Sequence, residues 1–172
     1  MQEETFMQKE TTCCFTGHRT MPTCLHAIKK NLEKSLCRLI DEGFISFCSG
    51  GALGFDMLAA ETVLHLRKKH PQIKLIMILP CTGQDRFWTK KQKAAYAAVL
   101  AAADKVIYTG ELYHRGCMQK RNRCLVDASS RVLAYLEKDS GGTKYTVDYA
   151  ENLGVEVENL FRPRKCQLSF FS

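Results

Sequence analysis

Residues 45–56 read ISFCSGGALGFD, an apolar run that passes directly into a glycine-rich turn. The run at residues 45–48 has the length and apolar character of a buried β-strand. Beyond the turn, apolar residues recur at helical spacing as far as residue 70. A buried strand, a glycine turn and a helix in this order begin a β-α unit, the repeating unit of parallel sheets.

The same alternation of short β-rich runs and longer helical patterns continues on both sides of this unit. We predict strands at residues 12–16, 45–48, 74–79, 105–108, 131–136 and 155–157, and helices at residues 24–42, 54–70, 85–103, 117–129 and 143–152. Strands separated by helices form right-handed crossovers. The predicted fold class is therefore α/β, a single domain with a doubly wound, mostly parallel sheet and helices on both faces. We place this domain at residues 11–160, between tails at 1–10 and 161–172.

The composition fits one globular domain, since 45% of the 172 residues are hydrophobic and 25% are charged. No apolar run approaches the roughly 20 residues that cross a bilayer, and residues 1–9 lack the layout of a signal peptide. We therefore expect a cytoplasmic protein. The nine cysteines are odd in number and form no CxxC pair. With no histidine at zinc spacing either, we expect neither a metal nor a cofactor.

The formal net charge is +7, and its location is more informative than its size. Residues 86–131 contain ten lysines and arginines against three acidic residues, while the two flanks together are neutral. A basic middle third suits a phosphorylated ligand, although such a bias also occurs on solvated helix faces. Charge alone leaves a small nucleotide and a nucleic-acid polymer both open.

Ligands of parallel α/β sheets bind outside the carboxyl ends of the strands, so the loops that follow strands form the candidate site. The first such loop, residues 16–19, contains Gly17, His18 and Arg19. Glycine lets the backbone approach a ligand closely, and the two side chains that follow can donate hydrogen bonds. A tight turn that carries polar residues by chance is the alternative interpretation.

The loop at residues 49–56 contributes Ser49, Gly50, Gly51, Gly54 and Asp56. Glycines before a helix expose successive backbone N–H groups at its positive end, and these can bind phosphate. The spacing matches neither GxGxxG nor a P-loop, so an ordinary dinucleotide or kinase-like site is disfavoured. Asp56 stands in the first turn of the helix, where it either caps the helix or accepts hydrogen bonds from ribose hydroxyls.

Two further loops complete the candidate site. Arg121 and Asn122 lie near the start of the helix before the fifth strand, where an arginine can bind phosphate through two hydrogen bonds. Gly141, Gly142 and Thr143 form a second glycine-rich turn between a strand and a helix. Two such turns in one small sheet favour a phosphate-binding site over a set of ordinary turns.

Two features of the segment after the third strand bear on this choice. Phe87 and Trp88 can stack on a base, but an aromatic pair at a helix start is interpreted as part of the core. On that interpretation the basic stretch is not interleaved with exposed aromatic residues, which disfavours a nucleic-acid surface. Cys81 also follows the strand, and we expect it to be the most exposed cysteine.

Together these motifs resemble the SLOG superfamily, specifically its YpsA-like family of bacterial and phage proteins. The likeness runs from about residue 11 to residue 157 and rests on the loops described above. It implies a Rossmann-like fold that binds nucleotides or nucleotide-derived ligands. It also implies a homodimer, which we expect to pair through the helix at 54–70 or 117–129. The superfamily includes DNA-processing protein A and the lonely-guy phosphoribohydrolases, while the YpsA-like family itself implies no reaction.

The phosphoribohydrolases carry Met-x-x-Arg-Lys followed by Pro-Gly-Gly-x-Gly-Thr-x-x-Glu, in which the arginine and the final glutamate are catalytic. Met118 and Arg121 match the first motif. The second motif differs, because Ser140 replaces the proline and Asp148 is the acid nearest to the expected glutamate. Arg121 and Asp148 are therefore the candidate catalytic residues, but the changed motif favours binding without hydrolysis.

We expect a domain that binds a nucleotide-like small molecule as a sensor or carrier, with no membrane contact. Two alternatives remain open, a phosphoribohydrolase acting on nucleoside 5′-monophosphates and a single-stranded DNA-binding module. The sequence leaves open whether any reaction is catalysed.

Overall fold

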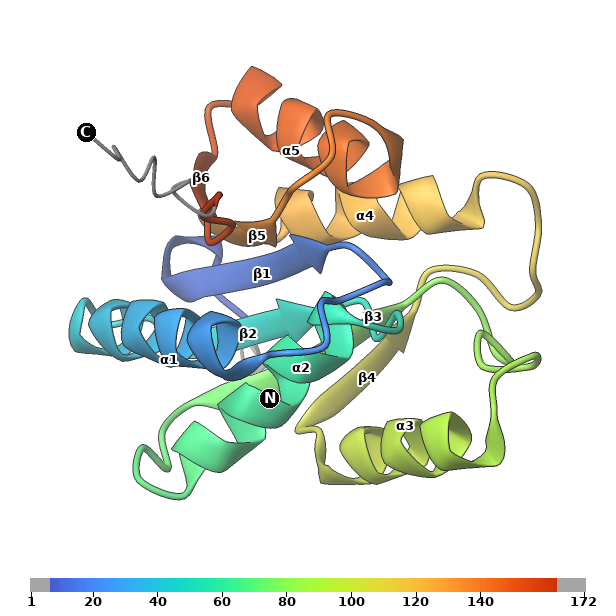
Figure 1. Ribbon diagram of the computed structural model, residues 1–172, viewed down its shortest axis with the longest axis horizontal. Helices are drawn as coiled ribbons and strands as arrows, with labels where there is room; N and C mark the ends of the chain where they lie inside the picture. The colour runs from blue at the N-terminus through green and yellow to red at the C-terminus, as the bar shows by residue number, and fades with distance from the viewer. Residues whose placement is uncertain (1–6, 164–172) are drawn as a thin grey trace, which may run out of the picture.

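The computed structural model describes residues 7–163, which form a six-stranded parallel sheet and five α-helices (Figure 1). The strands are β1 (Thr12–Gly17), β2 (Ser46–Ser49), β3 (Lys74–Leu79), β4 (Lys105–Tyr108), β5 (Arg131–Tyr135) and β6 (Glu156–Asn159). The helices are α1 (His26–Asp41), α2 (Phe55–Arg67), α3 (Lys90–Ala102), α4 (Cys117–Asp127) and α5 (Gly141–Asn152), after a 3₁₀ turn η1 (Lys9–Thr11). The predicted α/β sheet is confirmed. Residues 1–6 and 164–172 of the two predicted tails lie outside the described residues.

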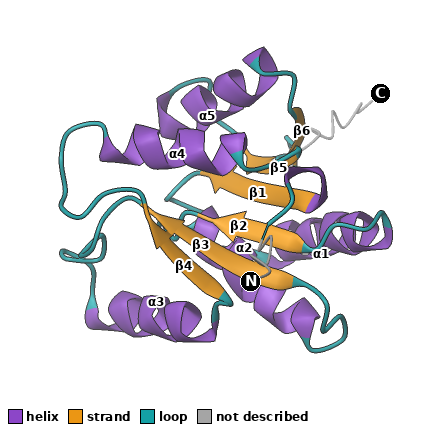
Figure 2. Cartoon of the chain, turned by 180° about the vertical axis from the view of Figure 1, so that it is seen from behind, coloured by secondary structure: helices purple, strands orange, loops and turns teal. Residues whose placement is uncertain are grey.

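The order of the strands creates a reversal in the middle of the sheet. The order is β4-β3-β2-β1-β5-β6, and every neighbouring pair is parallel. The chain moves outward from β1 to β4 and then returns through α4 to place β5 on the other side of β1. Helices α1, α2 and α3 consequently cover one face, and α4 and α5 cover the other (Figure 2). The carboxyl ends of β1 and β5 form the topological switch point, where ligands of such sheets bind.

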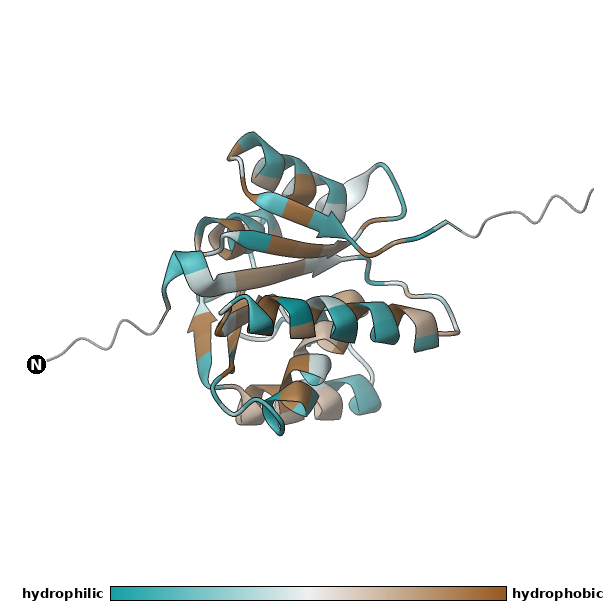
Figure 3. Ribbon diagram, turned by 90° about the vertical axis from the view of Figure 1, so that its left-hand side faces the viewer, coloured by the Kyte–Doolittle hydropathy of each residue, from teal (hydrophilic) through white to brown (hydrophobic). Residues whose placement is uncertain are grey.

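Two apolar clusters fill the spaces between the sheet and its two helix layers. Figure 3 shows hydrophobic and hydrophilic residues alternating along the helices, as expected for helices with one buried face. Successive strand residues face opposite sides, so Phe15 belongs to the cluster with α1 and α2, and Cys14 to the cluster with α4 and α5. Cys13, Cys14 and Cys48 are completely buried, and burial raises the pKa of each thiol. These cysteines therefore act as small apolar residues.

The segment between β3 and α3 differs from the sequence prediction. Helix α3 begins at Lys90 rather than at residue 85, because Thr89 and Gln92 form a reciprocal capping box. Residues 80–89 are therefore a loop at the carboxyl end of β3. Cys81 in this loop is only 1% exposed, since its thiol lies beside that of Cys117. The expectation that Cys81 is the most exposed cysteine is wrong.

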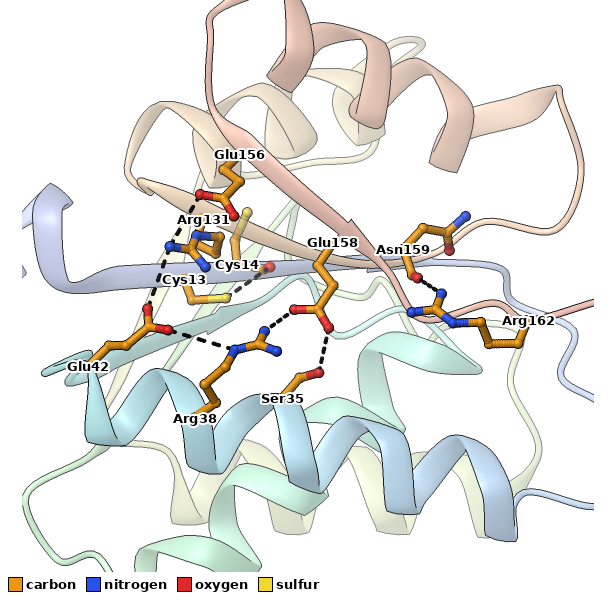
Figure 4. A network of polar contacts seen from close by, with 10 residues as sticks. All are labelled: Cys13, Cys14, Ser35, Arg38, Glu42, Arg131, Glu156, Glu158, Asn159 and Arg162. Carbon is orange, nitrogen blue, oxygen red and sulfur yellow. Dashed lines mark hydrogen bonds and ion pairs between the residues drawn. The ribbon is translucent and has the colours of Figure 1, made fainter.

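A polar network holds α1 against β5 and β6 (Figure 4). Arg38 of α1 pairs with Glu158 of β6. Arg131 lies 3.6 Å from Glu42 and 3.3 Å from Glu156. Arg131 and Glu156 are the first residues of their strands, so this part of the network lies at the amino ends of the strands, away from the switch point.

No helix between residues 7 and 163 is long and apolar enough to cross a membrane. Within this range, no three histidine, cysteine or acidic side chains come close enough to hold a metal ion.

Candidate functional site

A cavity of about 250 Å³ lies at the switch point between β1 and β5. Loops from four strand ends contribute to it, as expected for a doubly wound sheet. Its lining contains eight of the residues proposed from the sequence, Gly17, His18, Arg19, Asp56, Arg121, Asn122, Gly142 and Thr143, together with Thr16, Ala52 and Met118. The lining lacks six other proposed residues: Ser49, Gly50, Gly51, Gly54, Gly141 and Asp148.

Arg121 is the most unusual member of the cavity, because its side chain is only 3% exposed. Its Nε donates a 2.7 Å hydrogen bond to Asn122 Oδ1, and Nη1 donates to the carbonyl of Gly50 and, at 3.4 Å, to Gln84 Oε1. No carboxylate in residues 7–163 forms an ion pair with it, and Asp56 acts on it only at longer range. Burial lowers the pKa of Arg121, yet a guanidinium remains charged at physiological pH. The cavity therefore contains a fixed cation whose charge lacks a direct counter-ion.

The glycines of the loop at 49–56 make room for this arrangement. A Cβ atom at Gly50 would overlap the guanidinium of Arg121, and a Cβ at Gly54 would overlap the carbonyl oxygens of His18 and Arg19. Gly51 has φ +67°, and a Cβ atom there would lie only 3.0 Å from the side chains of Leu79, Met77 and Tyr96. These glycines thus shape the walls behind the cavity.

The backbone N–H groups of this loop already have protein acceptors. Gly51 N–H donates to Ser49 Oγ at 3.2 Å, Ala52 N–H to Asp56 Oδ2 at 3.3 Å, and Phe55 N–H to the carbonyl of His18 at 3.1 Å. The loop consequently offers a phosphate fewer donors than its glycine content predicts.

Asp56 both supports the turn before α2 and lines the cavity. Its Oδ2 accepts a hydrogen bond from the Ala52 N–H at 3.3 Å, and its side chain is part of the cavity wall. The carboxyl is 5% exposed, and burial raises its pKa to about 6, against the opposing charges of Arg121 and Arg19. At neutral pH most of the population carries a carboxylate, which can accept hydrogen bonds from ligand hydroxyls.

The amino end of α5 faces the same cavity through Gly142 and Thr143. The side chain of the N-cap residue, Ser140, makes no capping hydrogen bond. Free N–H groups at a helix start attract anions. Asp148 lies one turn further on, pairs with Lys144 and is 45% exposed, so the structure does not bring it to the cavity.

His18 serves the site differently from the sequence prediction, which gave it a donor role. Its Nε2 accepts hydrogen bonds from the backbone N–H groups of Glu137 (2.9 Å) and Lys138 (3.1 Å). Two donors at one ring nitrogen require the neutral imidazole, and burial lowers the pKa of His18. His18 therefore joins the loop after β1 to the loop after β5 across the switch point.

Sequence reasoning missed Gln84, and it did not place Thr16, Ala52 or Met118 among the ligand-binding residues. Gln84 supports Arg121 from behind, and its Nε2 donates to the Gly50 carbonyl at 3.3 Å and to Tyr96 Oη at 3.1 Å. Thr16 and Ala52 line the cavity, and so does Met118, whose Sδ lies 3.9 Å from Arg121 Nη2. Gln84 lies in a loop that follows a strand, so the expectation that such loops form the site includes this loop. No local sequence pattern, however, distinguishes this glutamine from its neighbours.

The contact of His18 predicts a change in the pH dependence of stability. The folded protein holds the pKa of His18 below its ordinary value of 6.5, so the unfolded chain takes up the proton first as the pH falls. The stabilising contribution is present above about pH 6.5 and is lost below it. We expect His18→Gln, which keeps an acceptor but cannot titrate, to remove this loss between about pH 7 and pH 5 in urea unfolding experiments.

Asp56 titrates in both proteins with the opposite sign, because its raised pKa makes the folded state less stable as the pH rises through about 6. The comparison of His18→Gln with the wild type cancels this common contribution. Parallel loss of stability in the two proteins would contradict the double hydrogen bond at His18.

Comparisons with known proteins place the chain in a family and match its fold. The family model described as the YspA SLOG family matches residues 13–159. The chain is 34% identical over 142 residues to the SPbeta prophage-derived protein YoqJ of Bacillus subtilis (strain 168), covering 76% of this chain and 83% of the relative. It is 32% identical over 133 residues to the UPF0398 protein YpsA of the same strain, covering 74% and 72%.

Two solved structures of DNA processing protein A share the fold. The protein from Streptococcus pneumoniae matches with a TM-score of 0.63 and 25% identity, over 87% of this chain and 50% of that chain. The protein from Helicobacter pylori matches with a TM-score of 0.64 and 19% identity, over 90% and 66%, and that protein binds single-stranded DNA. The chain thus spans about half to two thirds of these larger proteins.

Proposed function

Because the chain belongs to the YspA SLOG family, we propose that it binds a nucleotide or nucleotide-derived ligand at the switch point, as a sensor or carrier. The observation that carries this proposal is Arg121, a buried guanidinium in a cavity, with no carboxylate paired to it in the described chain. Leaving a buried charge without a counter-ion is costly, and an anionic ligand offsets that cost. Phosphate is the anion that suits the arrangement.

Two further features support phosphate as the bound group. The first turn of α5 presents backbone N–H groups at Gly142 and Thr143, and Arg19 adds an exposed cation at the rim. Helix starts and guanidinium groups bind phosphate through charge-assisted hydrogen bonds, each contributing about 1.5–3 kcal/mol. Asp56 is placed to accept hydrogen bonds from the sugar hydroxyls that accompany the phosphate.

Hydrolysis of a nucleoside monophosphate through Asp148 is disfavoured by the geometry. Cleavage of an N-glycosidic bond develops positive charge on the ribose, which a nearby carboxylate must stabilise. Asp148 pairs with Lys144 and does not line the cavity. Binding the phosphate equally in the ground and transition states would not accelerate the reaction.

The proposal is tested by comparing ligands that differ only in their phosphate. We expect calorimetry and thermal unfolding to detect binding of 5′-nucleotides, whereas the matching nucleosides bind at least about tenfold more weakly, because one charge-assisted contact alone accounts for that difference. Equal effects of nucleosides and nucleotides, or no rise in melting temperature with any of them, would refute the proposal.

A second candidate function, single-stranded DNA binding, is favoured by one observation that overturns a sequence interpretation. Phe87 was assigned to the core, but it is 88% exposed, and Leu112 and Tyr113 are 75% and 73% exposed. The guanidinium of Arg86 lies 4.9 Å from the Phe87 ring centroid. The loops that carry these residues project from the same side as the carboxyl end of β1 (Figure 1).

Exposed aromatic rings among basic side chains can stack on bases while the charges contact the nucleic-acid backbone. We expect Phe87→Ala and Tyr113→Ala each to weaken binding of a single-stranded oligonucleotide about five- to hundredfold, as stacking on one base contributes about 1–3 kcal/mol. Fluorescence anisotropy measures this, with the affinity falling steeply between about 0.05 and 0.2 M salt.

Tyr145→Ala provides the matched control, since Tyr145 is an exposed aromatic residue of α5 outside these loops. We expect it to bind the oligonucleotide like the wild type. Unchanged affinity in both loop variants, or equal affinity for a DNA duplex, would contradict a single-strand surface.

We further propose a homodimer in the cytoplasm, as the resemblance and the sequence predict. Of the two helices considered for pairing, α2 contacts both α1 and α3, and most of its residues are buried within the monomer. Helix α4 keeps several residues at the surface, including Lys120 and Arg123. Pairing through α4 is therefore the more favourable of the two, and analytical ultracentrifugation would test the dimer.

A further inference from the structure

The cavity at Arg121 is too small for a complete nucleotide-derived ligand. Sites for small molecules and cofactors usually measure about 300–1,000 Å³, whereas this cavity measures about 250 Å³. It has room for a phosphate and its sugar, but a larger ligand has to extend beyond it.

Two neighbouring cavities share lining residues with this one in turn. His18 and Arg19 also line a second cavity of about 370 Å³, whose other wall contains Glu137 and Lys138. Glu137 in turn lines a third cavity of about 690 Å³, with Tyr135 and Phe161. Through these shared residues the three cavities follow one another around the carboxyl ends of β1 and β5, from the α4 and α5 side of the sheet to the α1 side, and we call this series the trough.

The chemistry changes along this trough. Arg121 and the start of α5 form the cationic end. Arg19 and Lys138 place two more cations in the middle. The far end is aromatic, since the ring of Tyr135 packs edge-on against Phe161 at 5.8 Å. Two cationic positions followed by an aromatic one match two phosphates followed by a base.

The far end also offers a hydrogen-bonding group. Tyr135 lines the third cavity, and its phenol hydroxyl can both donate and accept a hydrogen bond. Within the third cavity, a ring nitrogen or carbonyl of a bound base can be its partner.

Two carboxylates line the trough, one near each end, and each can bind a sugar of a ligand that contains two sugars. Asp56 lines the first cavity, and Glu137 lines both the second and the third. Carboxylates accept hydrogen bonds from the neighbouring hydroxyls of a sugar. Along the trough, the first cavity therefore contains a carboxylate and a buried cation, and the second contains a pair of cations. The carboxylate of Glu137 comes next, and the aromatic rings of the third cavity come last.

From this order we propose that the trough binds a nucleoside diphosphate sugar. The distal sugar and its phosphate occupy the Arg121 cavity, the second phosphate lies at Arg19 and Lys138, and the nucleoside lies against Glu137, Tyr135 and Phe161. This inference rests on the proposed nucleotide-binding function and names its ligand class.

Calorimetry with a graded set of ligands tests the inference. The probes are ribose 5-phosphate, AMP, ADP, ADP-ribose and UDP-glucose. We expect at least one of the two nucleoside diphosphate sugars to bind tenfold or more tightly than AMP, with ADP between them. Ribose 5-phosphate, which fills only the first cavity, provides the reference for binding at Arg121.

Two conservative variants locate the ligand in the trough. Tyr135→Phe removes only the hydroxyl and is expected to weaken binding of the sugar nucleotide about two- to tenfold, the effect of one hydrogen bond. Lys138→Gln is expected to weaken it about two- to fivefold. Neither variant should alter binding of ribose 5-phosphate. Lys30→Gln, at an exposed lysine of α1 outside the three cavities, is the control and should bind every probe like the wild type.

The possible results separate this inference from the proposed function. If the sugar nucleotides bind no more tightly than AMP, or if both trough variants leave their affinity unchanged, the trough assignment is wrong while nucleotide binding stands. If no phosphorylated probe binds, the proposed function and the trough assignment both fail.

Discussion

Arg121→Lys is expected to weaken nucleotide binding about a hundredfold. The substitution keeps the positive charge but removes the rigid guanidinium, whose Nη2 group can donate to phosphate while Nε and Nη1 donate to the protein. The Arg121 guanidinium is also held by Gly50, Asn122 and Gln84, and a lysine ammonium cannot meet all of these acceptors and the ligand at once. Loss of about 3 kcal/mol of charge-assisted hydrogen bonding corresponds to this factor. Calorimetry with the tightest-binding nucleotide measures it.

Arg123→Lys is the matched control, because Arg123 lies on the same helix but donates to Tyr145 Oη on the protein surface. It should bind nucleotide like the wild type. Thermal unfolding of both variants without ligand establishes that each is folded under the conditions of the assay. A folded Arg121→Lys protein with wild-type affinity would show that this arginine does not contact the ligand.

The order of helices and strands could be predicted from the sequence because it depends on local patterns. The buried strands are continuous apolar runs, and the helices carry apolar residues at helical spacing, as in α1, where Leu32, Leu36 and Leu39 face the core. The doubly wound arrangement then follows from the right-handed rule for β-α-β connections. Exact ends could not be predicted in the same way, since the start of α3 depends on the capping box at Thr89.

The roles of individual site residues depend on contacts between distant segments, which a single sequence does not reveal. Gly50 was predicted to expose a backbone N–H to phosphate, but in the structure it leaves space for Arg121, 71 positions later in the chain. His18 was predicted to donate to a ligand, but it accepts from two N–H groups more than 100 positions away. In both cases the residue type indicated that the position belongs to the site, but the sequence did not reveal which residue it contacts.

The aromatic pair after β3 shows that burial, too, could not be predicted from the local sequence. Trp88 packs edge-on against Tyr96 at 5.1 Å and is partly buried, whereas Phe87, its neighbour, is exposed. Both residues stand in the loop that precedes α3, so no helical or strand periodicity distinguishes the inward side from the outward one. The choice is made by the tertiary position of Tyr96 on α3.

Gly54→Ala is expected to cause the largest loss of stability among single substitutions near the site. Gly54 has φ +83° and ψ −123°, a conformation that is strained for any residue with a side chain. A Cβ atom would also overlap the backbone carbonyls of His18 and Arg19, which cannot move without displacing the loop after β1. We expect unfolding to become easier by about 3 kcal/mol or more, as measured by urea denaturation.

Gly43→Ala separates the two causes of this loss. Gly43 follows α1 with φ +98°, so alanine there is strained as well, but no heavy atom lies within 4 Å of its Cβ position. This control should lose only about 1–2 kcal/mol, the cost of the backbone conformation alone. The excess in Gly54→Ala then measures how firmly the loop carrying His18 and Arg19 is packed on the start of α2. Equal losses in the two variants would mean that this loop yields to the added methyl group, and the cavity wall would then be a flexible one.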